Sequence, residues 1–198
     1  MPELHPQIVK AIEVTRQLGL KPIESLSPDE ARRQMEETAQ SRKAEPLPVA
    51  RVENRTIPGP AGPIPVRLYW PEETGPCPAI AYYHGGGHVI GSLDTHDLIA
   101  RNLCHGAAAL VCSVDYRMGP EHKFPAAVED SFAALEWLHQ NAASLGADPA
   151  RLGVHGDSAG GNLAAVVALI ARDQGGPKLR LQSLVYPVAD YTLSAPSY

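Results

Sequence analysis

The sequence has no hydrophobic run long enough to cross a membrane. Its longest apolar runs cover residues 107–114 and 163–171, whereas a membrane-spanning helix needs about 20 apolar residues. The first six residues also lack the basic and apolar regions of a secretory signal peptide. We therefore expect a cytoplasmic protein that neither crosses nor binds a membrane.

Basic clusters and paired cysteines are missing as well. The formal net charge is -5 and Lys and Arg are not grouped, which argues against a nucleic-acid partner because phosphate binding needs clustered cations. The three cysteines, Cys77, Cys104 and Cys112, have no C-x-x-C spacing, so neither a disulfide framework nor a zinc ribbon is predicted. Three glycines separate His84 from His88 and would break a helix between them. We expect no metal and no cofactor.

The 198 residues, 44% of them hydrophobic, can form one sizeable core with a small appendage. Apolar spacing predicts a helix over residues 6–18. An N-cap serine followed by proline and glutamate predicts a second helix over residues 27–43. We expect residues 1–45 to form cap helices and residues 46–198 the core, although a plain solvated helical extension would show the same pattern.

After residue 46 the apolar period changes to two, which predicts antiparallel strands over residues 49–57 and 64–70. Pro65 favours an edge position or a bulge for the second strand, because proline cannot donate to a neighbouring strand. Denser apolar runs then alternate with helical segments, as in a mostly parallel sheet with helices on both faces. Further strands are expected over residues 79–83, 108–114, 152–154 and 180–186, and helices over residues 94–106, 126–145 and 159–171. The predicted class is α/β.

A serine between glycines lies directly after one predicted strand and before an apolar helix. Ser158, with Gly156 and Gly160, forms the pattern G-x-S-x-G. A serine hydroxyl is a poor nucleophile and must be lifted clear of the backbone on a sharp strand-to-helix turn, where side chains at the glycine positions would collide with neighbouring elements. The pattern alone also occurs by chance, so its context decides.

The second informative stretch is H-G-G-G at residues 84–87, directly after a predicted buried strand. Acyl transfer passes through an oxyanion that needs fixed backbone N–H donors, and consecutive glycines let the main chain approach it. Such a loop pairs with the N–H after the nucleophile, here Ala159. A glycine triplet could instead be a flexible turn. The G-x-S-x-G pattern about two βα units downstream favours the catalytic interpretation.

Three motifs together resemble the hormone-sensitive lipase-like family of bacterial carboxylesterases. They are H-G-G-G at residues 84–87, D-Y-R-M-G-P-E with F-P-A-A within residues 115–127, and G-D-S-A-G-G-N at residues 156–162. The resemblance covers nearly the whole chain and is weakest in the N-terminal helices, which in the family belong to a cap over the substrate pockets. It implies an α/β-hydrolase fold and cofactor-free hydrolysis of short- to medium-chain esters.

The resemblance also implies roles for individual residues. Ser158 matches the family nucleophile, and the N–H groups of Gly86, Gly87 and Ala159 match the oxyanion hole. Gly85 matches the glycine that lets the loop turn.

Three further residues match supporting or flanking positions. His84 matches a structural residue that positions the oxyanion loop through hydrogen bonds, and we do not assign it as the general base. Asp157 is expected to point away from Ser158 and to fix the turn. His88 stands where the family usually has an aromatic residue, which would alter the polarity of the pocket.

The segment around residue 115 resembles a structural network under the site. We expect Asp115 to pair with Arg117 or to anchor nearby backbone rather than to serve as a catalytic acid.

The acid and base of a triad follow the serine in α/β-hydrolases, and here no histidine and no glutamate follow Ser158. We therefore expect the chain to be part of a longer esterase, cut after about the sixth strand and nearly inactive alone. Two alternatives stay open: a catalytically dead small-molecule binder of the same fold, as plant gibberellin receptors are, and an amidase. In the family, dimers often form through late strands, so a homodimer is possible.

Overall fold

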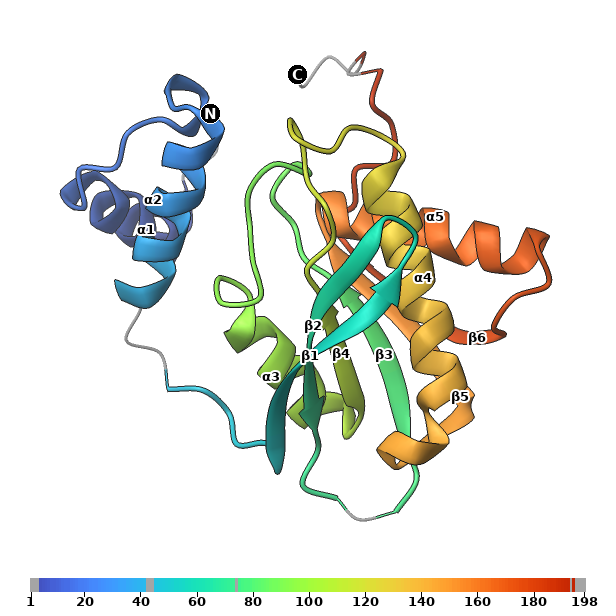
Figure 1. Cartoon of the computed structure of the whole chain (residues 1–198). Coiled ribbons are helices and arrows are strands. Elements are labelled where there is room, and N and C mark those ends of the chain that lie inside the picture. Colours follow the sequence, from blue (N-terminus) through green and yellow to red (C-terminus); the bar gives the residue numbers. More distant parts are fainter. Residues whose placement is uncertain (1–3, 42–44, 74, 193, 195–198) are drawn as a thin grey trace.

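The computed structural model describes residues 4–41, 45–73, 75–192 and 194. Its described strands form one six-stranded sheet in the order β1-β2-β4-β3-β5-β6 (Figure 1). β1 and β2 pair antiparallel, as do β2 and β4, while the remaining pairs are parallel. The strands are β1 (Arg51–Gly59), β2 (Gly62–Trp70), β3 (Cys77–Tyr83), β4 (Leu110–Val114), β5 (Ala147–Asp157) and β6 (Leu179–Val185). The mostly parallel α/β sheet predicted from the sequence is confirmed.

Helices cover both faces of this sheet, with α3 on one side and α4 and α5 on the other (Figure 1). The helices are α1 (Pro6–Gln17), α2 (Pro28–Ser41), α3 (Asp97–Ala107), α4 (Ala126–Asn141) and α5 (Ala159–Asp173), with short 3-10 turns η1 (Ile23–Ser25) and η2 (Ala143–Leu145). Each α-helix lies within a few residues of its predicted range. Residues 42 and 43, the end of the second predicted helix, lie outside the described residues.

The central strand β3 shows how the sequence builds two cores. Alternate side chains of a strand point to opposite faces. Ala81 and Tyr83 accordingly pack into the core shared with α4 and α5, while Ile80 and Tyr82 pack into a smaller core under α3. Every residue of β3 except Pro78 is buried, which explains its continuous apolar run.

The prediction of an edge position for the strand containing Pro65 is wrong. β2 lies inside the sheet, between β1 and β4, and the described edges are β1 and β6. β4 pairs only with residues 66–69 of β2, so the missing N–H of Pro65 breaks no ladder bond to β4. The carbonyl of Pro65 accepts a hydrogen bond from the N–H of Asp115 at 3.0 Å. β5 is also longer than residues 152–154.

The two N-terminal helices lie together, outside the sheet and its covering helices (Figure 1). α2 begins with the predicted capping box, in which the N–H of Ser27 donates to the carboxylate of Glu30 at 2.9 Å and its hydroxyl to the same carboxylate at 2.7 Å. α1 buries none of its residues, and α2 buries only Ala31. Their role as a cap over the core stays a prediction.

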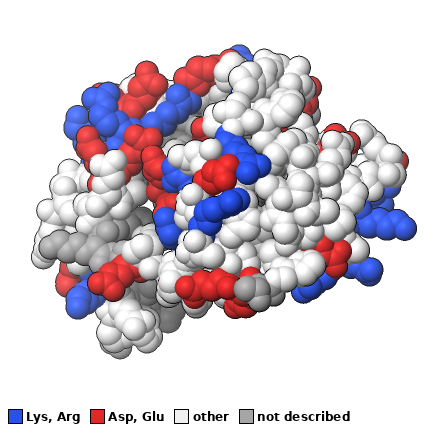
Figure 2. Space-filling view, turned by 60° about the horizontal axis from the view of Figure 1, so that its bottom comes forward, with Lys and Arg blue, Asp and Glu red and all other residues white. Residues whose placement is uncertain are grey.

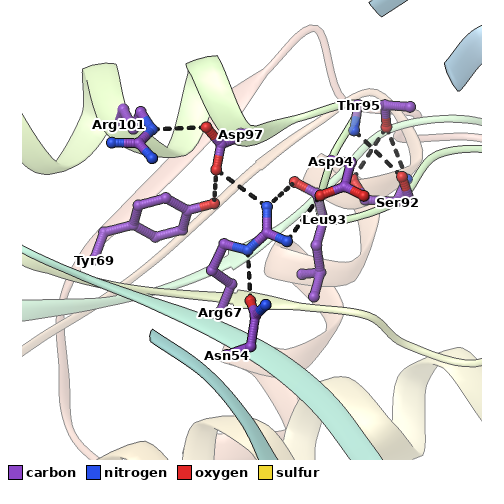
Figure 3. Close-up of polar contacts among 9 residues, drawn as sticks. All are labelled: Asn54, Arg67, Tyr69, Ser92, Leu93, Asp94, Thr95, Asp97 and Arg101. Atoms are coloured by element: carbon purple, nitrogen blue, oxygen red, sulfur yellow. Dashed lines mark hydrogen bonds and ion pairs between the residues drawn. The ribbon is translucent and has the colours of Figure 1, made fainter. Parts of the chain in front are cut away.

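A polar network ties the β1–β2 hairpin to the segment before α3 (Figure 3). The Arg67 guanidinium binds Asp94 at 2.8 Å and Asp97 at 3.1 Å, and the hydroxyl of Tyr69 donates to Asp97 at 2.7 Å. Burial raises the pKa of Tyr69 well above its ordinary value, and the neighbouring carboxylate adds to the rise. Arg67 thus binds residues on both sides of His96, whose place in the site is described below.

Charged side chains are mixed on the surface. On the face shown in Figure 2, Lys and Arg are interspersed with Asp and Glu rather than gathered into one basic patch. None of the described helices is both long and apolar enough to cross a membrane.

Candidate active site

Ser158 lies at the turn between β5 and α5, with φ 55° and ψ -118°. A positive φ is unusual for a residue with a side chain and persists only where the surroundings impose it. The N–H of Ser158 donates to the carbonyl of Val185 at 2.9 Å, and its own carbonyl accepts from the N–H of Asn162 at 3.1 Å. The serine is therefore held on a strained strand-to-helix turn, as a nucleophile elbow requires.

The flanking glycines are required by close approach rather than by flexibility. A Cβ on Gly156 would overlap the carbonyl of Gly160, and a Cβ on Gly160 would overlap the carbonyl oxygen of Tyr83 at the end of β3. α5 thus starts directly against the end of the neighbouring strand. This confirms the steric argument made from the sequence.

The glycine loop follows β3 and meets the elbow because β3 and β5 are adjacent and parallel, with Tyr83 opposite Gly156. The carboxyl ends of adjacent parallel strands form a common site. Gly86 has φ 121° and Gly87 has φ 63°, conformations that residues with side chains rarely adopt. A Cβ on Gly86 would overlap the carbonyl of Ile90. The structure thus brings the two motifs together, while the N–H donors assigned to Gly86, Gly87 and the fully buried Ala159 stay a prediction.

Asp157 occupies the space behind the elbow. Its carboxylate accepts a hydrogen bond from the Tyr82 hydroxyl at 2.9 Å and lies 3.8 Å from Nε2 of His96. A Cβ on Gly85 would overlap the same carboxylate, so the glycine is needed where the loop crosses it. Burial raises the pKa of Tyr82, and the Asp157 charge adds to the rise. Asp157 therefore joins the elbow to β3 and to the glycine loop.

His84 is a fully buried residue at the start of the glycine loop. Its ring stacks on Tyr116 at 4.5 Å between centroids, and its Nδ1 lies 2.8 Å from the carbonyl of Gly85. The hydroxyl of Tyr116 donates to the backbone carbonyl of His84 at 2.7 Å. Burial lowers the pKa of His84 to about 3, so the ring is neutral near pH 7 and contacts the loop rather than the nucleophile.

Of the two roles expected for Asp115, the ion pair with Arg117 is wrong, and anchoring of nearby backbone stays a prediction. Arg117 instead binds the buried carboxylate of Asp130 on α4 through its guanidinium at 2.8 Å, and through its backbone N–H at 3.0 Å. Asp115 is half-buried, and burial raises the pKa of its carboxyl. Sequence proximity suggested the wrong partner, because α4 crosses beneath the segment and Asp130 is its buried acid.

A cavity of about 510 Å³ opens beside the elbow. Asn162 and Leu163, about one helical turn after Ser158, line it together with His88. Nε2 of His88 lies 2.7 Å from the hydroxyl of Tyr191, and burial lowers the pKa of its imidazole. The exposed surface of the remaining walls is mostly apolar. Six apolar residues form much of it, alongside three polar or charged side chains, Gly119 and Tyr191. The apolar residues are Val89, Phe124, Pro125, Ala127, Val128 and Val166, and the polar or charged ones are Arg117, His122 and Lys123. A larger cavity of about 1220 Å³ lies between α5 and β6, away from the glycine loop.

Sequence reasoning missed His96 and Tyr191. His96 is separated from Asp157 by about 60 residues and no motif links them, and Tyr191 follows the last predicted strand in an irregular segment. Across the described ranges, no group of three or more His, Cys, Asp or Glu side chains could hold a metal ion.

The arrangement of a serine turn and a glycine loop at the carboxyl end of a parallel sheet defines an α/β-hydrolase. A family model for the alpha/beta hydrolase fold matches residues 80–198. Carboxylesterase NlhH of Mycobacterium tuberculosis is 54% identical over 155 residues, covering 77% of this chain and 48% of that protein. Ethyl acetate hydrolase of Pseudomonas putida is 39% identical over 199 residues, covering 96% of this chain and 61% of that protein.

Solved structures show the same likeness. A hyperthermophilic esterase from the archaeon Pyrobaculum calidifontis superposes with a TM-score of 0.85 at 42% identity, over 95% of this chain and 60% of that chain. The chain belongs to the hormone-sensitive lipase-like carboxylesterase family of α/β-hydrolases. It spans about half to three fifths of the length of the relatives it matches.

Proposed function

We propose that the protein hydrolyses short- to medium-chain carboxylic esters through an acyl-enzyme intermediate on Ser158. The observation that carries this proposal is the strained backbone of Ser158, held against the glycine loop at the carboxyl ends of β3 and β5. The names of the relatives, which include a carboxylesterase and an ethyl acetate hydrolase, support ester hydrolysis as the reaction.

In the proposed mechanism, Oγ of Ser158 attacks the ester carbonyl while its proton passes to a general base. The N–H groups of Gly86, Gly87 and Ala159 stabilise the oxyanion of the tetrahedral intermediate. The intermediate collapses as the base gives its proton to the leaving oxygen, which departs as the alcohol. Water then attacks the acyl-serine while the base takes one of its protons. The base returns that proton to Oγ of Ser158 as the acyl–Oγ bond breaks and the carboxylic acid is released. An apolar acyl or alcohol chain fits the mostly apolar cavity beside the elbow.

The proposal places the general base and its acid partner outside residues 1–198. No histidine and no glutamate follow Ser158 in the sequence. His84 does not fill this role, because it is buried, neutral and bound to the loop. Loss of a triad member leaves a residual rate about a thousandfold or more below that of an intact triad.

Hydrolysis of p-nitrophenyl butyrate by the full-length protein tests the proposal. We expect Ser158→Ala to abolish turnover and Ser144→Ala, at an exposed serine on the far side of the fold, to leave it unchanged. The 198-residue chain should retain only the residual rate. Equal rates for the full-length parent and Ser158→Ala would refute the proposal.

A catalytically dead small-molecule binder is the second candidate, favoured by the lack of a histidine after Ser158 within residues 1–198. A fluorophosphonate probe separates the two, because it labels only a serine whose proton can be removed. Labelling of the full-length protein at Ser158 supports the esterase, and absence of labelling supports the binder.

A further inference from the structure

One arginine on α2 supplies four hydrogen bonds to the core. Nε of Arg32 donates to the carbonyl of Val89 at 2.8 Å, and one terminal nitrogen donates to the carbonyl of Gly119 at 2.8 Å. The two terminal nitrogens also bind the two carboxylate oxygens of Glu121 at 2.8 and 2.7 Å. On the same helix only Ala31 is buried. Arg32 is therefore a main attachment of α2 to the core.

The two carbonyls belong to different loops that meet at the cavity beside Ser158. Val89 follows the glycine loop, and Gly119 lies in the segment between β4 and α4. Both residues line the 510 Å³ cavity. The N–H of Gly119 also donates to the carbonyl of His88 at 2.8 Å. Arg32 thus lies outside the cavity and binds both loops where they meet.

We propose that Arg32 is a specificity-determining positioning residue, which fixes the spacing of these two loops and thereby the width of the substrate cavity. The inference rests on the proposed function, because it assigns the cavity to the substrate chain. Arg32 lines neither the cavity nor the Ser158 turn, so it acts through the backbone of Val89 and Gly119.

The contribution of the forked shape of the guanidinium can be distinguished from the contribution of its positive charge. Glu121 is about half exposed, so its pair with Arg32 is screened by solvent and contributes little by itself. The carbonyls, in contrast, need two donors pointing in two fixed directions from one planar group. Lysine carries the same charge on one nitrogen and cannot reproduce that fork. The structure therefore predicts that Arg32→Lys behaves like a loss of the residue, and that Glu121→Gln does not.

Steady-state kinetics of the full-length protein test the proposal with p-nitrophenyl acetate and p-nitrophenyl hexanoate. For Arg32→Met and Arg32→Lys we expect the KM for hexanoate to rise about tenfold, with kcat within about twofold and a smaller change for acetate. Glu121→Gln is the matched control and should leave both KM values within about twofold. Equal losses of kcat for both esters, or rescue by Arg32→Lys, would overturn the positioning role.

Hydrogen exchange gives a readout that needs no substrate. The amides of residues 88–92 and 117–121 should exchange faster in Arg32→Met and Arg32→Lys than in the parent, and circular dichroism should show that the variants stay folded. Unchanged exchange in both loops refutes the inference even if the protein is an esterase. If the parent lacks esterase activity but exchange rises as expected, the proposed function fails, while the role of Arg32 in fixing the spacing of the two loops is supported.

Discussion

The hydroxyl of Tyr82 lies 2.9 Å from Oδ1 of Asp157, so a direct side-chain hydrogen bond joins β3 to the end of β5 behind Ser158. Both residues are buried. The strained serine turn is therefore supported by its own strand partner as well as by the backbone of β6. The contribution of this hydrogen bond to the free energy of unfolding can be measured without any assay of activity.

Tyr82→Phe should lower the free energy of unfolding by about 1–3 kcal/mol, because it leaves a buried carboxylate oxygen without its donor. Urea denaturation monitored by circular dichroism measures the change. Tyr186→Phe removes a hydroxyl at an exposed tyrosine and should change stability by no more than about 0.5 kcal/mol. Equal effects of the two substitutions would contradict the buried role of Tyr82.

Gly160→Ala should destabilise the fold by about 3 kcal/mol or more, since its Cβ would overlap the backbone oxygen of Tyr83 and neither backbone segment can yield cheaply. Gly106→Ala is the control. Gly106 lies in α3 with no atom within 4 Å of an added Cβ, and alanine there should stabilise the helix by up to about 1 kcal/mol. Urea unfolding of both variants should therefore give shifts of opposite sign.

His84 should make the fold sensitive to mild acid. Its pKa is about 3 in the folded protein, lowered by burial, and near 6.5 when exposed. Between these values the unfolded chain binds a proton that the folded chain does not, so stability falls as the pH falls, by up to about 1.4 kcal/mol per pH unit. Unfolding free energies of the parent and His84→Asn between pH 4 and 8 should converge toward acid. Parallel profiles would contradict this assignment.

Arg117→Met should cost about 3 kcal/mol of stability, because Asp130 is only 1% exposed and would keep a buried charge without its guanidinium partner. Arg172→Met is the control, since Arg172 pairs with Asp173 at the surface. The control should leave the thermal midpoint unchanged. A comparable drop in both variants would show that the Asp130 pair is no stronger than a surface pair.

The sequence was sufficient to predict the elements that depend on local patterning. Period-two and continuous apolar runs located the strands, and the S-P-D-E signature located the start of α2. Gly156 and Gly160 were predicted correctly because tight turns leave a local signal that does not depend on distant contacts.

Contacts between distant segments could not be predicted in the same way. The partner of Arg117 is set by where α4 crosses the sheet, and the interior position of Pro65 by the short pairing of β2 with β4. The contact between His88 and Tyr191 joins a loop to an irregular segment 103 residues away. Each of these depends on the packing of whole elements, which apolar spacing does not encode.

Strand β3 carries two tyrosines in succession, and their side chains lie on opposite faces of the sheet. Tyr82 bonds to Asp157 behind the serine, while Tyr83 donates to the carbonyl of Ser131 on α4. A spectroscopic label such as fluorotyrosine at one position or the other would therefore follow either the reactive turn or the helical layer. A label at Tyr82 would thus monitor the environment of the serine turn, and a label at Tyr83 would monitor the packing of α4 against the sheet.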